Sequence, residues 1–297
     1  MILPIQLIVA ILFSAVFAVC PVHASTDWTP LVKRLVTDSF DEKSTQALFT
    51  HPDVKFDPDA MSNKIRDLIN SRFKKPELIP AEKRKVVYDR FLKPGVIAEA
   101  RSYTRKNAAT LTDIEKSYCV PREVIVAILL VETNLEGFLG NKSAFNTLAS
   151  MALSNKLEAI RPYLPSDLIT HENEDFAERR CRQKSDWAYK ELKALIRYAS
   201  KQGINPLSIP GSIYGAIGIC QFMPSTISTY GIDADKDGHI DVFSRQDALF
   251  SVANFLRCHG WKCKMSNNRQ HKIIKAYNHS NIYANTVLQV AERLKQN

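Results

Sequence analysis

The chain has 297 residues, of which 45% are hydrophobic and 24% are charged. These fractions are ordinary for a globular protein, and the length is sufficient for one large domain or two small ones. The net charge of +9 and the pI near 9.2 favour an acidic partner, such as an acidic cell-wall polymer or anionic lipid. Nucleic acid is the weakest candidate, because the sequence has no zinc finger, no RNA-binding aromatic motif and no long Lys/Arg cluster.

The N-terminus has the pattern of a secretory signal. Ile5–Val19 is almost continuously apolar, and Val22–Ala24 is an acceptable cleavage site. We interpret residues 1–24 as a signal peptide, although no Lys or Arg precedes the apolar run, which is short for a spanning helix. Cys20 is a candidate lipid-anchor site, but Val19 is bulky for the position before such a Cys. The sequence predicts export to the periplasm, with a lipid anchor at Cys20 as the less favoured alternative.

Export makes disulfides possible. If Cys20 leaves with the signal, an odd number of cysteines remains, namely Cys119, Cys181, Cys220, Cys258 and Cys263. Cys258 and Cys263 flank Gly260, where a helix is expected to end. A local bridge between these two residues is one interpretation, and two small buried thiols are the other.

The rest of the chain is predicted to be mainly helical, because no alternating strand pattern of useful length occurs. Residues 25–118 form a predicted N-terminal helical region, whose last helix carries Leu111, Ile114 and Tyr118 on one stripe. Residues 154–185 are charged and are interpreted as an insertion that forms a surface excursion. Further helices are expected at Trp187–Ala199, Asp247–Leu256 and Tyr283–Leu294.

Glu132 follows a run that is apolar all round, from Val124 to Val131. Pro121 fits a first helical position, so we expect a buried helix from Pro121 to about Leu135. Desolvation raises the pKa of a buried carboxyl, and an acid still protonated near neutral pH can protonate a glycosidic oxygen. The alternative is that the side chain reaches solvent at the helix end.

The glycine-rich segment Gly211–Ser225 is a second candidate for the site. It lacks the Lys-Ser/Thr pair of a nucleotide-binding loop, so phosphate binding is not expected. Its small residues would let the backbone approach a sugar, while Gln221 offers an amide. Phe222 is expected to be a core residue. The tripeptide Ala276–Asn278 supplies a hydroxyl and a further amide.

In this order, residues 132–134 with Gly140, residues 211–225, and residues 276–278 with Tyr283 are similar to motifs of the lytic murein transglycosylases, most closely the membrane-bound lytic transglycosylase B family. The resemblance extends over about residues 90–294. It implies a lysozyme-like helical core at residues 119–297 that acts on peptidoglycan glycan strands. The substrate-binding residues that it implies are Ser212, Tyr214, Gln221, Tyr277 and Asn278.

Residues 233–241 match the first nine positions of an EF-hand calcium loop. Ser244 stands where the bidentate Glu is expected, and Asp247 resembles the variant loop of the same family. We expect a structural Ca²⁺ of modest affinity in a small subdomain at residues 233–247, with a solvated Asp-rich turn as the alternative. The predicted ligands are Asp233, Asp235, Asp237, the carbonyl of His239, and Asp247. No cofactor is expected for the chemistry itself.

The resemblance implies a reaction with one acid. Glu132 would protonate the oxygen between N-acetylmuramic acid and N-acetylglucosamine, and would then deprotonate the muramyl 6-hydroxyl to close a 1,6-anhydro ring. Tyr277 would face Glu132 across the cleft. The family usually has Gly at the position of Glu136. Glu136 could raise the pKa of Glu132, act as the second carboxylate of a hydrolase, or be an exposed residue at the helix end.

Two other functions stay open. The protein could be a muramidase that adds water, which the mass of the product would reveal. It could also be a non-catalytic wall-binding subunit of an envelope complex, in which case it would bind glycan without turnover.

Overall fold

The computed structural model describes residues 26–74 and 86–296. The predicted signal peptide and Cys20 lie outside the described residues. Within the described ranges the chain is mainly helical, as expected, and its only sheet pairs two short strands. None of the described helices is both long and apolar enough to cross a membrane.

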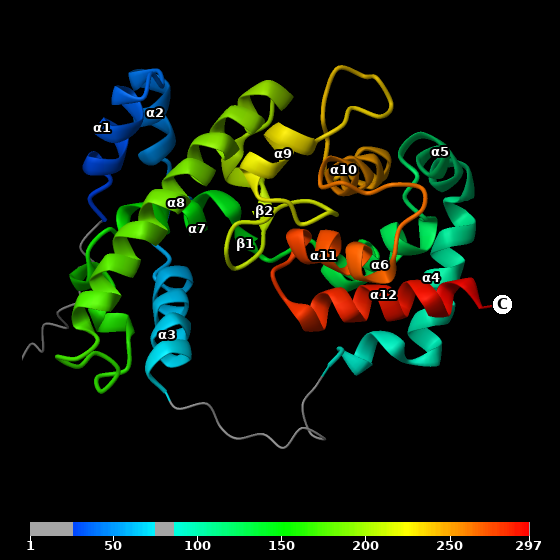
Figure 1. Cartoon of the computed structure of the whole chain (residues 1–297). Helices are drawn as coiled ribbons and strands as arrows, with labels where there is room; N and C mark the ends of the chain where they lie inside the picture. The colour runs from blue at the N-terminus through cyan, green and yellow to red at the C-terminus, as the bar shows by residue number, and fades with distance from the viewer. Residues whose placement is uncertain (1–25, 75–85, 297) are drawn as a thin grey trace, which may run out of the picture.

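The α-helices follow one another along the chain (Figure 1) as α1 Thr29–Thr37, α2 Glu42–Phe49, α3 Asp59–Phe73, α4 Pro94–Lys106, α5 Ala108–Tyr118, α6 Arg122–Thr133, α7 Ala144–Leu153, α8 Glu174–Gln202, α9 Pro224–Tyr230, α10 Arg245–Cys258, α11 Asn267–Tyr277 and α12 Asn281–Lys295. The short 3₁₀ helices are η2 Asp89–Leu92, η3 Leu157–Ala159, η4 Arg161–Tyr163 and η5 Pro206–Ser208. The strands are β1 Lys142–Ser143 and β2 Pro210–Gly211.

The helices form two groups (Figure 1). In the α8 group, α1, α2 and α3 lie with α7 and α8. In the α6 group, η2, α4, α5, α10, α11 and α12 lie around α6. The short helix α9 contacts both α8 and α10 and therefore joins the groups. The expected N-terminal region 25–118 is thus divided, because residues 26–74 belong to the α8 group and residues 86–118 to the α6 group.

α6 is the buried centre of its group. Every residue from Val124 to Leu130 is at most 3% exposed, since α12, α4, α5 and α10 all contact this helix. Burial on all sides explains why the run is apolar on every face rather than on one stripe. The helix begins at Arg122, after an extended Pro121, and ends at Thr133 because Asn134 is left-handed with φ 51°.

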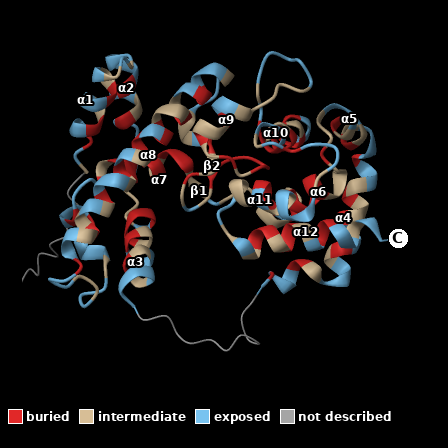
Figure 2. Cartoon of the chain, viewed as in Figure 1, coloured by how far each residue is buried: buried red, intermediate tan, exposed pale blue. Residues whose placement is uncertain are grey.

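α8 overlaps the expected insertion at residues 154–185. The helix begins at Glu174, so only residues 154–173 lie outside regular α-helix. Ala177, Cys181 and Ser185 are spaced by four residues and are fully buried. The buried face could not be recognised from the sequence, because it consists of small residues and the other faces of the helix are charged. Figure 2 shows the resulting change between buried and exposed faces along α8.

One disulfide joins distant parts of the α6 group. Cys263 pairs with Cys119, which lies 144 residues earlier, so the expected local bridge from Cys258 to Cys263 is wrong. Cys258 is free and exposed. The buried ring of Trp261 donates from Nε1 to the Cys119 carbonyl at 3.0 Å beside the bridge. This packing brings Cys263 to the start of α6, which local spacing cannot reveal.

Candidate active site

Glu132 lies in the last turn of α6, where the helix leaves the core. The residue is half-buried, and burial raises the pKa of its carboxyl to about 7, although a hydrogen bond from Tyr283 acts in the opposite direction. Near neutral pH a large fraction of this carboxyl therefore carries its proton. A half-buried carboxylic acid of this kind can deliver a proton to a group that approaches from solvent.

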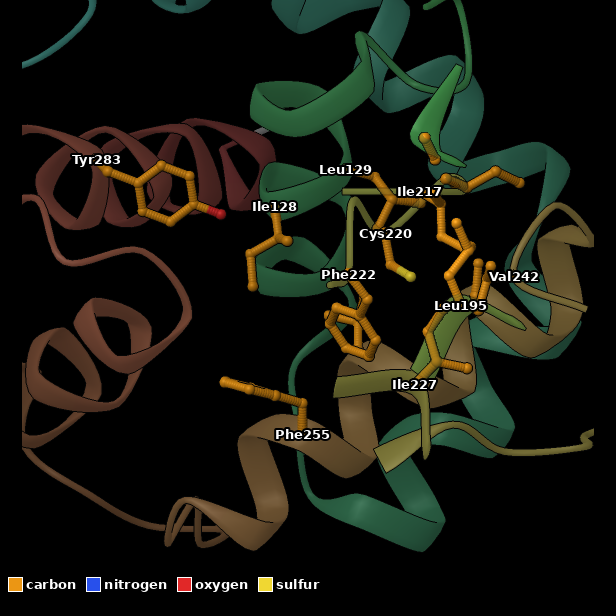
Figure 3. Close-up of a cluster of buried hydrophobic side chains, with 14 of the residues drawn as sticks. Ile128, Leu129, Leu195, Ile217, Cys220, Phe222, Ile227, Val242, Phe255 and Tyr283 are labelled. Carbon is orange, nitrogen blue, oxygen red and sulfur yellow. The ribbon is translucent and has the colours of Figure 1, made fainter. Parts of the chain in front are cut away.

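Two tyrosines from the C-terminal helices lie beside Glu132. The Tyr283 side chain extends from α12 toward α6 (Figure 3), and its ring is parallel to that of Tyr277, with centroids 6.4 Å apart. The Tyr277 hydroxyl donates to the Cys220 carbonyl at 2.5 Å. The buried Tyr283 hydroxyl has no partner at hydrogen-bond distance among the described residues, and it is close enough to Glu132 to lower the pKa of that carboxyl.

These contacts do not include a hydrogen bond between Tyr277 and Glu132. A phenol has one proton to donate, and that of Tyr277 is committed to a backbone carbonyl rather than to Glu132. Tyr283, which belongs to the motifs but has no predicted role in the site, lies beside Glu132. An isolated Tyr near the start of a helix gives no local signal of such a role. Only the packing of α12 against α6 brings it to the acid.

The glycine-rich segment lies against the end of α6. Thr133 donates from Oγ1 to the Ile219 carbonyl at 3.2 Å, directly after Glu132 in the chain. Gly140 and Gly211 face each other so closely that a Cβ on Gly140 would lie 2.2 Å from the Gly211 carbonyl oxygen. The small residues therefore permit close approach between backbone segments, in addition to any approach by a sugar.

A cluster of buried side chains packs against the glycine-rich segment (Figure 3). It combines Ile128 from α6, Leu195 from α8, Phe255 from α10, and Cys220 and Phe222 from the segment itself. Phe222 is 3% exposed, which confirms the prediction that it is a core residue. The cluster includes residues of both helix groups, so it fixes the segment relative to Glu132.

The predicted substrate-binding side chains take part in local contacts. Ser212 accepts the backbone amide of Ala216 at 3.0 Å, and Gln221 donates from Nε2 to the Gly218 carbonyl at 2.9 Å. The Ser212 proton and the Gln221 carbonyl oxygen remain for a ligand. Tyr214 is half-buried beneath the Lys64 ammonium, 3.7 Å from its ring centroid. Asn278 is exposed at the end of α11.

Glu191 is a buried carboxylate that the sequence pattern did not reveal. It lies on the buried side of α8 and is 5% exposed. Its oxygens accept the amide and the hydroxyl of Ser225 at 2.9 and 2.8 Å, at the N-terminus of α9. The carboxylate thereby satisfies one free amide at the start of α9 and orders the turn that follows the glycine-rich segment.

Glu136 is neither a free carboxylate nor a residue at a fraying helix end. Its Oε1 accepts the Tyr103 hydroxyl at 2.5 Å and Nε of Arg245 at 2.6 Å. Burial would raise the pKa of Glu136, but hydrogen bonds from Arg245 and Tyr103 outweigh it, so the pKa is below its usual value. The causes that shift the pKa of Glu132 do not include Glu136. Glu136 is therefore ionised and has no proton to deliver.

The predicted calcium loop brings three carboxylates together. Oxygen atoms of Asp233, Asp235 and Asp237 lie within 4.8 Å of one another. Asp247 is 1% exposed and stands apart from this cluster, where it accepts the backbone amides of Ala234 and Asp241 at 2.9 and 2.7 Å. That Asp247 is a direct ligand stays a prediction. Its carboxylate joins both ends of the loop to α10.

A cavity of about 1360 Å³ lies elsewhere, among residues of α1 and α2 together with Tyr163. None of the predicted site residues lines it. The catalytic assignment therefore rests on the chemistry around Glu132 rather than on cavity size.

The chain is similar to known cell-wall enzymes. It is 27% identical to the membrane-bound lytic murein transglycosylase B of Escherichia coli (strain K12) over 172 residues, which are 58% of this chain and 40% of that protein. The chain thus matches less than half the length of this relative.

Solved structures share the fold. The soluble lytic transglycosylase SltB1 of Pseudomonas aeruginosa superposes with a TM-score of 0.68 at 22% identity, over 91% of this chain and 99% of that one. SltB3 of the same organism, in complex with NAG-anhNAM-pentapeptide, gives 0.68 at 19% identity, over 91% and 79%. Escherichia coli Slt35 in complex with calcium gives 0.66 at 19% identity, over 92% and 93%.

These likenesses confirm the expected lysozyme-like fold of the lytic transglycosylases. A family model described as "Transglycosylase SLT domain" matches residues 24–270, which is most of the chain and includes Glu132 and the glycine-rich segment. The resemblance inferred from the motifs is confirmed, and this protein belongs to the transglycosylase SLT domain family.

Proposed function

We propose that the protein is a peptidoglycan lytic transglycosylase that cleaves the bond between N-acetylmuramic acid and N-acetylglucosamine. The observation that carries the proposal is the half-buried Glu132, whose pKa is raised to about 7 at the end of α6. Family membership supports the reaction class, and the glycan fragment bound to the related SltB3 supports the substrate class.

The reaction needs one proton donor that later becomes a base. Glu132 protonates the bridging oxygen while the bond from that oxygen to muramyl C1 breaks, and the N-acetyl group of the substrate stabilises the positive charge. The Glu132 carboxylate then removes the proton from the muramyl 6-hydroxyl as O6 bonds to C1. No water is consumed, and the acid returns to its first state. A carboxyl that titrates near neutrality suits both steps.

The environment of Glu136 favours this reaction over hydrolysis. A hydrolase would use a second carboxylate to activate water or to bond to the sugar. The Glu136 carboxylate is already bound by Arg245 and Tyr103. Tyr283 is then the group that orients the acid, and Tyr277 orients the Cys220 carbonyl behind it.

The glycan is proposed to lie along the glycine-rich segment and the end of α11. The Ser212 hydroxyl and the Gln221 carbonyl oxygen would bind sugar hydroxyl and N-acetyl groups. Tyr214, Tyr277 and Asn278 complete the proposed substrate contacts. The basic net charge of +9 suits an acidic glycan with peptide stems.

A calcium ion is proposed for the loop at residues 233–247. The converging oxygens of Asp233, Asp235 and Asp237 fit a hard cation, because carboxylates so close together repel one another when unpaired. The His239 carbonyl is the proposed fourth contributor, while Asp247 supports the loop through backbone amides. When bound, the ion would supply structural charge neutralisation and no step of the reaction.

Periplasmic location is part of the proposal. The disulfide between Cys119 and Cys263 is typical of an oxidising compartment, and the named relative is a membrane-bound enzyme. Peripheral membrane or envelope-complex association would then bring the protein to its substrate. We further propose that residues 1–24 are a signal peptide and that the catalytic unit includes residues 86–118.

The decisive experiment is mass analysis of products from purified glycan strands. A transglycosylase yields anhydro-muramyl ends, which are lighter by one water than hydrolytic ends. Reducing ends of full mass would identify a muramidase. Tight binding without any product would identify a non-catalytic wall-binding subunit.

A further inference from the structure

The backbone that follows Glu132 is unusual. Asn134, Leu135 and Glu136 are consecutive left-handed residues with φ of 51°, 58° and 77°. Residues other than glycine rarely adopt this conformation, and a run of three requires contacts that hold it. A feature of this kind at the end of the catalytic helix calls for a physical explanation.

The contacts that hold this turn come from two other helices. Glu136 accepts the Tyr103 hydroxyl of α4 at 2.5 Å, and its two oxygens accept Nε and a terminal nitrogen of Arg245 of α10 at 2.6 and 2.9 Å. We call these three side chains the Glu136 clamp. The paired contact between guanidinium and carboxylate fixes direction as well as distance. The clamp therefore fastens the turn at its last residue to both α4 and α10.

The turn in its clamped form also closes the end of α6. The amide of Leu135 donates to the Leu129 carbonyl at 3.2 Å, and the amide of Glu136 donates to Oγ1 of Thr133 at 3.2 Å. The same Thr133 hydroxyl contacts the Ile219 carbonyl of the glycine-rich segment. Glu132 immediately precedes Thr133, so a turn that relaxed would release the helix end from which the acid projects.

We propose that the Glu136 clamp is a positioning device, which holds the left-handed turn and thereby the orientation of the Glu132 carboxyl. The inference rests on the proposed function, in which Glu132 is the acid. Glu136 is a positioning residue, because its carboxylate is committed to Arg245 and Tyr103. This role explains why a carboxylate close to the acid is held in an ion pair instead of facing solvent.

Steady-state kinetics on glycan strands test the proposal. Glu136→Gln and Arg245→Met are expected to lower kcat roughly tenfold, while KM changes by less than about twofold, because substrate contacts remain. Arg245→Lys keeps the charge but loses the paired geometry, so its kcat should be intermediate. Wild-type kcat in Glu136→Gln would overturn the proposal. A loss as large as that of Glu132→Gln would also overturn it, because Glu136 would then act in the chemistry.

The matched control breaks an ion pair at the other end of the same helix. Arg122 begins α6 and binds Glu115 of α5, with Nε to Oε2 at 2.8 Å. Glu115→Gln should lower the melting temperature and leave kcat within about twofold of wild type. If kcat fell equally in Glu115→Gln and Glu136→Gln, the loss would result from a less stable α6 and not from the clamp, and the proposal would be overturned.

Glycine at position 136 should restore part of the kcat that alanine at this position loses, because glycine adopts a positive φ without steric cost. Glu136→Ala removes the clamp and keeps the steric cost of positive φ, whereas Glu136→Gly removes both. The expected order of kcat is wild type, then Glu136→Gly, then Glu136→Ala. A lower kcat for the glycine variant than for the alanine variant would show that the turn need not be held, against the proposal.

Amide hydrogen exchange reports on the clamp without turnover. Amides of residues 133–138 are expected to exchange several-fold faster in Glu136→Gln than in wild type, and at the wild-type rate in Glu115→Gln. Unchanged exchange in Glu136→Gln would overturn the clamp. If the wild type proved inactive while exchange changed as expected, the proposed function would fail, and with it the role in positioning, but the clamp itself would stand.

Discussion

At the scale of single residues, the proposed chemistry depends on the environment of one carboxyl, that of Glu132. Glu132 lies between the buried residues Leu130 and Thr133 of α6, so its backbone is rigid while its side chain is half-buried. Burial raises its pKa, and the stability of the fold therefore falls as pH rises from the usual Glu pKa to about 7. The same desolvation thus prepares the acid and destabilises the protein, a common relation at active sites.

Replacement of the acid should separate these two effects. Glu132→Gln keeps the shape and removes the transferable proton, so turnover should fall about a hundredfold or more while glycan binding persists. The variant should also be more stable than wild type at pH 8, by about 3 kcal/mol at most, because an ionised buried carboxyl is lost. Below the usual Glu pKa the side chain at position 132 is uncharged in both the wild type and the variant, so their melting temperatures should converge. Near-native turnover would remove Glu132 from the reaction.

The pH dependence of the rate follows from the same pKa. The acid must be protonated before the bond breaks, and its pKa is raised to about 7. The value of kcat/KM should therefore be highest below pH 7 and fall as pH rises through 7, toward about tenfold per pH unit at the alkaline end. A rate that is constant from pH 5 to pH 9 would contradict a titrating Glu132 as the proton donor.

The two tyrosines should respond differently to loss of their hydroxyls. Tyr283→Phe removes the donor that lowers the pKa of Glu132, so the alkaline limb of the pH profile should move to higher pH. Tyr277→Phe frees the Cys220 carbonyl, and the expected effect is a loss of about 1–3 kcal/mol in stability with the alkaline limb unchanged. Identical shifts of the limb in both variants would mean that Tyr277 also binds Glu132.

At the scale of elements, the loop between α9 and α10 joins the two helix groups. Gly238 turns the loop at φ 92°, and Gln202 of α8 accepts the Ile240 amide at 3.1 Å. Asp247 fastens the other side of the loop to α10 through Ala234 and Asp241. A cation bound between these attachments would hold α8 and α10 together without touching a sugar.

Calcium should therefore raise stability and leave the chemistry unchanged. A ligand that binds only the folded state stabilises it by mass action, so a hundredfold excess over the dissociation constant adds about 2.7 kcal/mol. Chelation should lower the melting temperature, calcium should restore it, and Asp237→Ala should abolish both responses. Asp113→Asn is a matched control, since Asp113 is exposed on α5 and lies outside the loop. If neither chelator nor calcium changes the melting temperature, the loop is an Asp-rich turn that binds no calcium.

At the scale of the whole molecule, long-range links hold the α6 group around the acid. The disulfide from Cys119 to Cys263 joins the start of α6 to the segment between α10 and α11. α12 returns against α6 and delivers Tyr283. The two groups then share the buried cluster beneath the glycine-rich segment, so the site depends on both (Figure 3).

Loss of the disulfide should destabilise the protein substantially. A bridge across 144 residues restricts the unfolded chain, and the chain-entropy model assigns it about 5 kcal/mol. Cys263→Ser should lower the melting temperature markedly, whereas Cys258→Ser should change it little because Cys258 is free and exposed. Equal melting temperatures for Cys263→Ser and wild type would show that the bridge does not form in solution.

The sequence by itself determined the helical class, the buried helix that carries Glu132, and the Asp-rich loop. Each is a local pattern, because helix periodicity, apolar composition and loop spacing can be recognised within a window of about 15 residues. The motifs in their order also determined the family. The raised pKa of Glu132 followed from burial, which an apolar run on all faces implies.

Only the tertiary structure decided which groups serve the acid. Tyr283 lies beside Glu132, Glu136 is held by α4 and α10, and Cys263 pairs with Cys119. Each of these contacts joins residues that are far apart in the sequence, such as Tyr103 and Glu136, 33 positions apart, or Cys119 and Cys263, 144 positions apart. Sequence spacing does not specify which distant elements pack together. The physical reason is that helix packing depends on the shape of whole faces, whereas motifs record only the neighbours along the chain.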